Sequence, residues 1–325
     1  MPAVSVIIPV YNVEQYIARC AHSLFKQTLK DIEFLFIDDC SPDNSIGIMR
    51  QVLESYPERK NQVIVYRMPT NSGQAAVRMQ GIKMATGSYI IHCDSDDYPL
   101  PMAYQHMYEK ARDNDLDIVT CNVAIERDGR IIQEMEGRCT SVSKMLQGKE
   151  RWSLFSRLVR RELLEGIDAP VANMGEDMVI SIQTQLNAKR TGHVDEVLYH
   201  YCFRDNSITN VAGIDARIAR WETLMKNVYL MVSVLKNKYG YSDNDQDIIL
   251  YKYNSRTPLR PLVHIPEHYN RWKETFPEID KKMFSLPSFS AEDKFWFVLI
   301  HLHLYHPAKC FTGWLKKHNL LPNKS

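Results

Sequence analysis

The segment Gly87-Ser-Tyr-Ile-Ile-His-Cys-Asp-Ser-Asp-Asp97 is the most informative part of this sequence. Its residues 89–93 are apolar and β-prone and lie between Gly87 and a run of acids, which predicts a short buried strand. Three carboxylates follow at once, those of Asp94, Asp96 and Asp97. Anions placed so close together are costly unless a cation or water neutralises them. The alternative is an acidic turn that caps the next helix, because Asp and Ser are common at turns and helix caps.

Strand and helix patterns alternate along the chain before this segment. Buried strands are predicted at residues 4–10, 33–37 and 63–66, and helices at residues 13–24, 45–56 and 71–85. A repeat of about 25–30 residues is typical of a parallel sheet covered by helices. Ligands of such sheets bind beyond the carboxyl ends of the strands, which is where the three aspartates lie.

The pattern changes after residue 101. We predict helices at 102–113, 152–164 and 176–188, strands at 118–121 and 194–203, a hairpin at 123–132 around Asp128-Gly129, and a loop at 166–175. Beyond residue 212 the sequence is helical, and prolines divide it into short pieces. The predicted fold is therefore α/β, a mainly parallel mixed sheet between helices in domain 1–212, with a helical C-terminal region at 213–325.

Composition narrows the function and the compartment. Residues 1–210 carry 23 basic and 28 acidic side chains and residues 211–325 carry 17 and 11, so neither part has the basic face of a nucleic-acid binder. The seven cysteines are odd in number and never spaced Cys-x-x-Cys, which argues against a disulfide framework and a zinc site. No signal-peptide pattern and no apolar run of about 18–20 residues is present. We expect a cytoplasmic protein, with any membrane contact peripheral and at the inner face.

Four segments, taken in order, resemble family 2 glycosyltransferases of the GT-A fold. They are residues 4–12 (VSVIIPVYN), 36–45 (FIDDCSPDNS), 71–97 (NSGQAAVRMQGIKMATGSYIIHCDSDD) and 175–178 (GEDM). The resemblance covers about residues 1–210, and Cys40 lies where the family usually has a glycine. It implies a Rossmann-like GT-A domain that transfers a sugar from a nucleotide donor to an acceptor hydroxyl, with inversion at the anomeric carbon.

The resemblance places a nucleotide site at the ends of the first two strands. Asp39 would accept the N3–H of a uracil ring, and capping of its own turn is the alternative role. Pro9, Tyr11 and Asn12 would line the base, with Tyr11 stacking on it or simply packing.

The aspartate segment would bind the rest of a UDP-sugar. The candidate ligands of Mn²⁺ or Mg²⁺ are Asp96, as the principal ligand, with Asp94 also near the ribose or sugar and Asp97 in support. Hard oxygen ligands suit these ions, and the ion would stabilise the UDP leaving group. Ser95 lies in the same turn as a further donor-binding candidate. Arg78 would meet a phosphate or Asp94, or form a surface ion pair.

Inversion requires one base that takes the acceptor's proton. Asp177, at the start of a helix, is the candidate, because a helix N-terminus favours a carboxylate. Glu176 would bind or orient the acceptor, and helix capping is the alternative for both residues. His200, Arg204 and Ser207 resemble the family's flexible loop after the last strand, where basic groups cover the diphosphate.

The expected reaction is hexosyl or N-acetylhexosaminyl transfer from a UDP-sugar to a saccharide or lipid-linked saccharide, in bacterial-type surface polysaccharide or glycolipid assembly. One alternative is a sugar nucleotidyltransferase, although residues 11–13 lack the glycine-rich loop and lysine that it would need. Another is a non-catalytic nucleotide-sugar-binding protein on the same fold. Near the C-terminus, aromatic and aliphatic residues at 295–300 precede lysines without acids. This suits an anionic membrane surface, with a core helix and a solvated basic tail as the alternative.

Overall fold

The computed structural model of the chain describes residues 1–203 and 213–317, and beyond Phe311 only the course of the backbone. The chain divides into two compact units. The first contains residues 1–145 and 149–231, and the second contains residues 146–148 and those from 232 onward. The predicted domain boundary at residue 212 stays a prediction.

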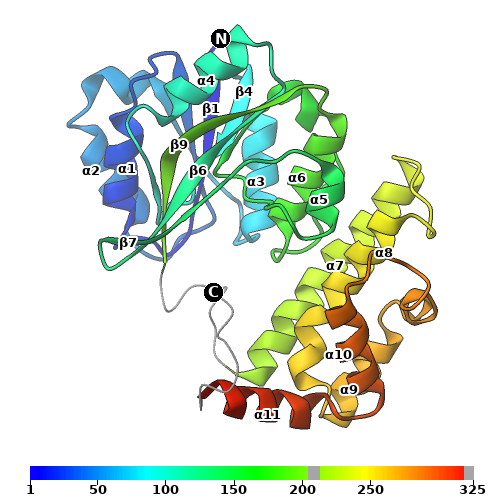
Figure 1. Cartoon of the computed structure of the whole chain (residues 1–325). Coiled ribbons are helices and arrows are strands. Elements are labelled where there is room, and N and C mark those ends of the chain that lie inside the picture. The colour runs from blue at the N-terminus through cyan, green and yellow to red at the C-terminus, as the bar shows by residue number, and fades with distance from the viewer. Residues whose placement is uncertain (204–212, 318–325) are drawn as a thin grey trace. The chain divides into compact units, whose positions relative to one another are not determined.

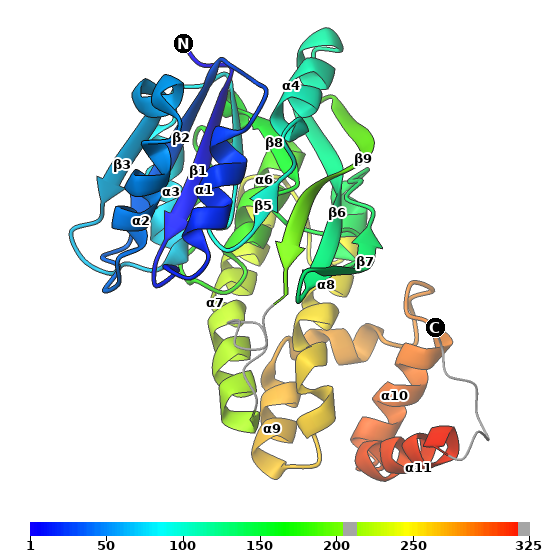
Figure 2. The same cartoon turned by 90° about the vertical axis from the view of Figure 1, so that its left-hand side faces the viewer.

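The described part of the first unit forms one mixed sheet. Its strand order is β3-β2-β1-β4-β8-β6-β9-β5, and β7 pairs with β6. The strands are β1 (Val4–Val10), β2 (Ile32–Asp38), β3 (Val63–Arg67), β4 (Tyr89–His92), β5 (Tyr98–Pro99), β6 (Ile118–Arg127), β7 (Arg130–Met135), β8 (Arg157–Arg160) and β9 (Thr191–Cys202). The first four strands in the order run parallel, as Figure 2 shows for β1, β2 and β3. All residues of β2 and β4 are buried, as expected of strands covered on both faces.

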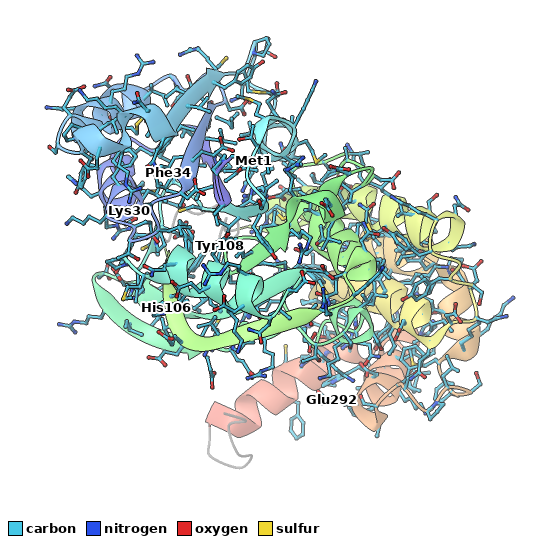
Figure 3. All side chains as sticks on the ribbon, turned by 90° about the horizontal axis from the view of Figure 1, so that it is seen from above. Met1, Lys30, Phe34, His106, Tyr108 and Glu292 are labelled. Atoms are coloured by element: carbon cyan, nitrogen blue, oxygen red, sulfur yellow. The ribbon has the colours of Figure 1, made fainter. Side chains whose placement is uncertain are left out.

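Helices cover both faces of this sheet (Figure 1). One face packs on α1 (Ile17–Phe25), α2 (Ser45–Leu53) and α4 (Ala103–Asp113), and the other on α3 (Gln74–Met84) and α6 (Glu176–Asn187). Successive residues of β1 alternate between the two cores: Val6 and Ile8 lie in the first and Ile7 in the second. On α4, which carries the labelled His106 and Tyr108 of Figure 3, the Tyr108 ring centroid lies 6.0 Å from that of Tyr89 in β4. The predicted α/β class and the helix-covered mixed sheet are confirmed.

The helix predicted at residues 152–164 is wrong. This segment contains β8 and a 3₁₀ turn, Arg161–Leu164. β8 lies between β4 and β6 and pairs antiparallel with both. The side chain of Arg157 is buried, and its Nη1 donates to Gln185 at 2.8 Å. Pairing on two sides and a buried cation are tertiary effects that local propensity does not contain.

The hairpin predicted around Asp128 and Gly129 is confirmed. Both residues have positive φ, +50° and +75°, as a tight turn between antiparallel strands requires. The strand that enters the turn is longer than predicted, because β6 continues from residue 118 to residue 127 and pairs with β9 along most of its length.

The described part of the second unit is helical, as predicted. Its helices are the end of α7 (Ile214–Asn237), then α8 (Gln246–Arg256), α9 (Pro266–Glu274), α10 (Ala291–His301) and α11 (Tyr305–Lys317), with 3₁₀ turns at Thr257–Leu262 and Pro277–Lys282. Trp272 is fully buried, and the guanidinium of Arg256 lies 4.5 Å from its ring centroid. Ser290 and Asp293 form a capping box at the start of α10. Among the described residues no helix combines the length and apolarity needed to span a bilayer.

Candidate functional site

Candidate residues from three neighbouring strands meet at one edge of the sheet. β1, β2 and β4 run parallel, so their carboxyl ends lie together. Asn12 follows β1, Asp39 follows β2, and residues 94–97, here called the aspartate turn, follow β4. Parallel pairing of buried strands is therefore what brings these segments, which are far apart in sequence, to one place.

Asp39 is buried and already holds two backbone groups. Its Oδ1 accepts the N–H of Ser72 at 2.7 Å and its Oδ2 accepts that of Gly73 at 2.8 Å. A carboxylate offers about four lone-pair positions, so each oxygen keeps one for a ligand. Tyr11 is 48% exposed beside this site, and Asn12 has a φ of +54° while its N–H donates to Ser41 Oγ at 2.8 Å. Pro9 lies half-buried within β1.

Cys40 shows why a glycine is usual at its position. Its φ is +57°, in the left-handed region that glycine adopts without strain and other residues adopt rarely. The Sγ atom donates to the carbonyl of Met68 at 3.0 Å, a contact that only a side chain can make. The turn is therefore kept without glycine.

Arg78 joins the aspartate turn to the start of α6. Its Nη2 donates to Asp94 Oδ1 at 2.7 Å and its Nε to Glu176 Oε1 at 3.4 Å. Burial alone would lower the pKa of Arg78, but the charges of Asp94 and Glu176 raise it above its ordinary value. The buried Nη1 has no hydrogen-bond partner among the described residues, which leaves one cationic donor for a ligand oxygen.

His92 lies at the end of β4, and burial together with the charge of Arg78 lowers its pKa well below the usual range. Its buried Nδ1 also lacks a partner in the described chain. Sequence patterns did not single out this histidine, which adds a neutral imidazole beside the cation of Arg78.

Two adjacent acids begin α6. Burial, followed by the charge of Asp177, raises the pKa of Glu176 to about 7, although Arg78 opposes the shift. Burial also raises the pKa of Asp177. The N–H of Met178, which donates to Asp177 Oδ1 at 2.8 Å, lowers this pKa by a smaller amount. The helix N-terminus was expected to favour the carboxylate form of Asp177, but desolvation has the larger effect on its pKa. A carboxylate with a raised pKa is a stronger base.

The loop before α6 is fixed from two directions. Asn227 Nδ2 donates to the carbonyls of Ala172 and Met174 at 2.8 and 2.9 Å. Asn173 Oδ1 accepts the N–H of Ala75 at 3.2 Å, in the first turn of α3. Gly175 has a φ of +79°, and a Cβ there would lie 2.6 Å from Leu224. The position of Glu176 and Asp177 thus depends on contacts that sequence patterns do not reveal.

The carboxylates of the aspartate turn differ in their surroundings. Asp97 is buried, and its oxygens accept the Cys202 N–H at 2.7 Å and the Tyr199 hydroxyl at 3.0 Å. Burial raises the pKa of Asp97 well above its ordinary value. Ser95 is also buried, whereas Asp94 and Asp96 are half-buried.

This donor set fits a divalent cation that binds together with a diphosphate. No group of three or more His, Cys, Asp or Glu side chains in the described chain is placed to hold an ion alone. Mg²⁺ commonly binds through one or two carboxylates plus substrate phosphates, and Asp96 with Asp94 supplies carboxylates of that kind.

The structure places His200 in a polar cluster with Arg19, Tyr98 and Glu126, and Arg19 contacts the aspartate turn. Sequence reasoning missed the last three, which carry no motif. Arg204 and Ser207 lie outside the described residues.

Comparison with known proteins identifies the family. The model of glycosyl transferase family 2 matches residues 5–162. The uncharacterized glycosyltransferase EpsJ of Bacillus subtilis is 33% identical over 275 residues, which cover 80% of this chain and 77% of EpsJ. An uncharacterized glycosyltransferase of Haemophilus influenzae is 40% identical over 258 residues, covering 78% of this chain and 96% of that protein.

A poly(ribitol-phosphate) beta-glucosyltransferase of Bacillus spizizenii is 30% identical over 218 residues, which cover 65% of this chain and 34% of that protein. Among solved structures, S. aureus TarS 1–349 in complex with UDP-GlcNAc has a TM-score of 0.56 at 19% identity, covering 87% of this chain and 91% of TarS 1–349. The mannosyltransferase PcManGT of Pyrobaculum calidifontis, in complex with GDP-Man and Mn²⁺, has a TM-score of 0.51 at 14% identity, covering 93% and 87%. These structural likenesses confirm the predicted GT-A fold.

Proposed function

This chain belongs to glycosyl transferase family 2, and on that premise we propose that it is an inverting, metal-dependent enzyme that uses a UDP-sugar. The transferred group would be a hexosyl or N-acetylhexosaminyl residue. The observation that supports this best is the position of Arg78, whose buried guanidinium contacts both Asp94 in the aspartate turn and Glu176 at the start of α6. Donor-binding carboxylates and the candidate base Asp177 thus belong to one site.

On the donor side, Asp39 would accept the uracil N3–H with the lone pairs that Ser72 and Gly73 leave. Asp96, with Asp94, would hold Mn²⁺ or Mg²⁺ against the diphosphate, while Asp97 keeps the turn in place. The ion, when bound, would supply Lewis-acid stabilisation of the UDP leaving group. Ser95 would contact the donor from the same turn. His200, Arg204 and Ser207 remain proposed contributors to the diphosphate site.

On the acceptor side, a carboxylate oxygen of Asp177 would take the proton of the attacking hydroxyl. The acceptor oxygen bonds to the anomeric carbon as the bond to the UDP oxygen breaks, which inverts the configuration. Because its pKa is about 7, Glu176 is partly protonated at neutral pH and can donate a hydrogen bond to the acceptor. Arg78 would keep the pKa of both acids from rising further.

The acceptor class is proposed from chemistry and from relatives. Relatives whose names refer to poly(ribitol-phosphate) glucosylation and to minor teichoic acid biosynthesis support a saccharide or lipid-linked saccharide of a bacterial surface polymer. TarS in complex with UDP-GlcNAc supports a UDP-linked donor.

We also propose a cytoplasmic location with peripheral contact to anionic membrane through the second unit. Phe295 and Val298 of α10 and Leu302 directly after it are 56%, 39% and 59% exposed, at a spacing that suits one face of a helix. Phe311 is 60% exposed, and Lys309 lies on the same short helix. The sequence adds further basic residues, whose side chains the structure does not describe: Lys316, Lys317 and Lys324. Apolar side chains beside cations suit an anionic lipid surface.

Liposome co-sedimentation tests this contact. The double substitution Phe295→Ser and Leu302→Ser should reduce binding to vesicles that contain anionic lipid. Ile131→Ser with Ile132→Ser, at 53% and 55% exposed positions of β7, is the matched control. Binding that ignores anionic lipid, or equal loss in both variants, would contradict the proposal.

The test of the catalytic proposal is hydrolysis of a panel of UDP- and GDP-sugars with Mn²⁺. Turnover of one or more UDP-sugars is expected. Binding of UDP-sugars without turnover, in the presence of candidate acceptors, would favour the non-catalytic alternative. Preference for a GDP-sugar would overturn the uracil assignment.

A further inference from the structure

Four polar side chains from four elements lie close together next to the aspartate turn. Arg19 comes from α1, Tyr98 from β5, Glu126 from β6 and His200 from β9; we call them the Glu126 cluster. Glu126 is 8% exposed, so its charge is held away from water. Such a carboxylate is costly to bury unless its oxygens are paired.

Hydrogen bonds in the cluster converge on Glu126. The Tyr98 hydroxyl donates to Glu126 Oε2, and His200 Nδ1 lies 3.2 Å from the same oxygen and 2.9 Å from the Tyr98 hydroxyl. Because a carboxylate only accepts and Tyr98 uses its proton on Glu126, His200 must carry a proton on Nδ1. The rings of Tyr98 and His200 stack with centroids 4.7 Å apart.

Arg19 completes the cluster and connects it to the turn. Its Nη1 lies 3.7 Å from Glu126 Oε1, its guanidinium carbon lies 4.9 Å from the Tyr98 ring centroid, and its Nη2 donates to the main-chain carbonyl of Asp96 at 2.8 Å. Burial alone would raise the pKa of Glu126, but Tyr98, His200 and Arg19 lower it below the ordinary value. The carboxylate therefore stays charged and attracts the cation of Arg19, whose side chain is 45% exposed.

The turn is thus held at its central aspartate and at the residue that follows it. Arg19 fixes the carbonyl of Asp96, while β9 fixes the next residue, Asp97, through Tyr199 and Cys202. A site that binds an ion works only when its ligands are held within about 0.5 Å of the productive geometry by their supporting contacts.

We propose that Arg19, oriented by the Glu126 cluster, is a positioning residue that sets the backbone of Asp96 and thereby the affinity for the metal–diphosphate part of the donor. This inference rests on the proposed function for its ligand. It gives His200 a second role beside the proposed one at the diphosphate, because its Nδ1 contacts Glu126 and Tyr98 in the cluster.

The experiment compares Arg19→Met with Arg112→Met. Both remove a cation and keep an apolar stem, and the Arg112 side chain, 56% exposed, pairs with Asp113 on the surface of α4. Hydrogen–deuterium exchange of the ligand-free protein is measured for peptides that cover residues 94–99. Arg19→Met should speed exchange there by about tenfold, the loss expected for one charge-assisted hydrogen bond. Arg112→Met should not.

Calorimetry then measures the affinity for UDP in the presence of Mn²⁺ and the affinity for uridine alone. Arg19→Met should weaken UDP–Mn²⁺ binding by about tenfold and leave uridine binding and the Tm unchanged, a split that general destabilisation would not give. Tyr98→Phe, which removes only the hydroxyl that donates to Glu126, should weaken UDP–Mn²⁺ binding in the same selective way.

Unchanged exchange of residues 94–99 in Arg19→Met overturns the inference, whatever the protein binds. Equal losses for uridine and UDP–Mn²⁺ also overturn it, because they would indicate a general effect. If exchange is faster in Arg19→Met but the wild-type protein does not bind UDP–Mn²⁺, the proposed donor is refuted. The inference that Arg19 holds the turn is then still supported.

Discussion

Replacing Arg78 with methionine tests how much this cation stabilises the acidic side chains of the site. The change keeps most of the apolar stem and removes the cation that lies 2.7 Å from Asp94 and 3.4 Å from Glu176. Removing one partner of a buried ion pair typically costs about 3–5 kcal/mol. We expect the lower end, about 3 kcal/mol, because Glu176, with a pKa of about 7, can take up a proton at little cost.

The pH dependence follows from the same pKa. The folded protein holds the Glu176 proton up to about pH 7, whereas the unfolded chain releases it near its ordinary pKa of 4.5. The contribution of Glu176 to the free energy of unfolding is therefore at its highest below pH 4.5. It falls by about 3 kcal/mol as the pH rises to 7 and then levels off. Arg78 lowers this pKa, so in Arg78→Met the fall should continue above pH 7, by about 1.4 kcal/mol per unit.

Urea unfolding between pH 5 and pH 9 measures both effects. Arg138→Met is the control, because Arg138 pairs with Glu136 on the surface and should change the free energy of unfolding by no more than about 1 kcal/mol. Parallel stability curves for wild type and Arg78→Met would refute the coupling of Arg78 to Glu176. So would a loss no larger than that of the control.

Three further outcomes are expected at the same site. Asp177→Asn should lower kcat by about 10²–10⁴-fold with UDP binding preserved, and a kcat above about a tenth of wild type would assign the base to another group. Glu176→Gln should mainly raise the acceptor KM, and a kcat loss as large as that of Asp177→Asn would reverse the two roles. Because Asp39 accepts N3–H, calorimetry should show UDP binding about 5- to 150-fold more tightly than CDP, whose ring nitrogen there is an acceptor. Equal affinities would contradict the uracil contact.

The parallel half of the fold was predictable because its signals are local. Strands such as β1 and β2 are continuous apolar runs, and their carboxyl ends must share an edge once they pair in parallel. That rule alone brings Asp39 and the aspartate turn together. The positive φ of Cys40 likewise accounts for the glycine that the family usually has at this position.

What could not be predicted depends on contacts between distant segments. β8 was mistaken for a helix because its strand character comes from pairing with β4 and β6. Arg19 and Glu126 are ordinary residues of a helix and a strand until the fold places them 3.7 Å apart next to the turn. The raised pKa of Glu176 is similarly a product of burial, which no motif encodes.

The most direct measurement of the central proposal is donor hydrolysis by Asp96→Ala and by wild type, with Mn²⁺ and with EDTA. The substitution removes a half-buried side chain from a turn, so the fold should remain intact by circular dichroism and Tm. Metal-dependent use of a UDP-sugar predicts that wild type turns over with Mn²⁺ and stops in EDTA, and that Asp96→Ala loses both turnover and metal-dependent UDP binding. Unchanged turnover in Asp96→Ala, or full wild-type activity in EDTA, would contradict it.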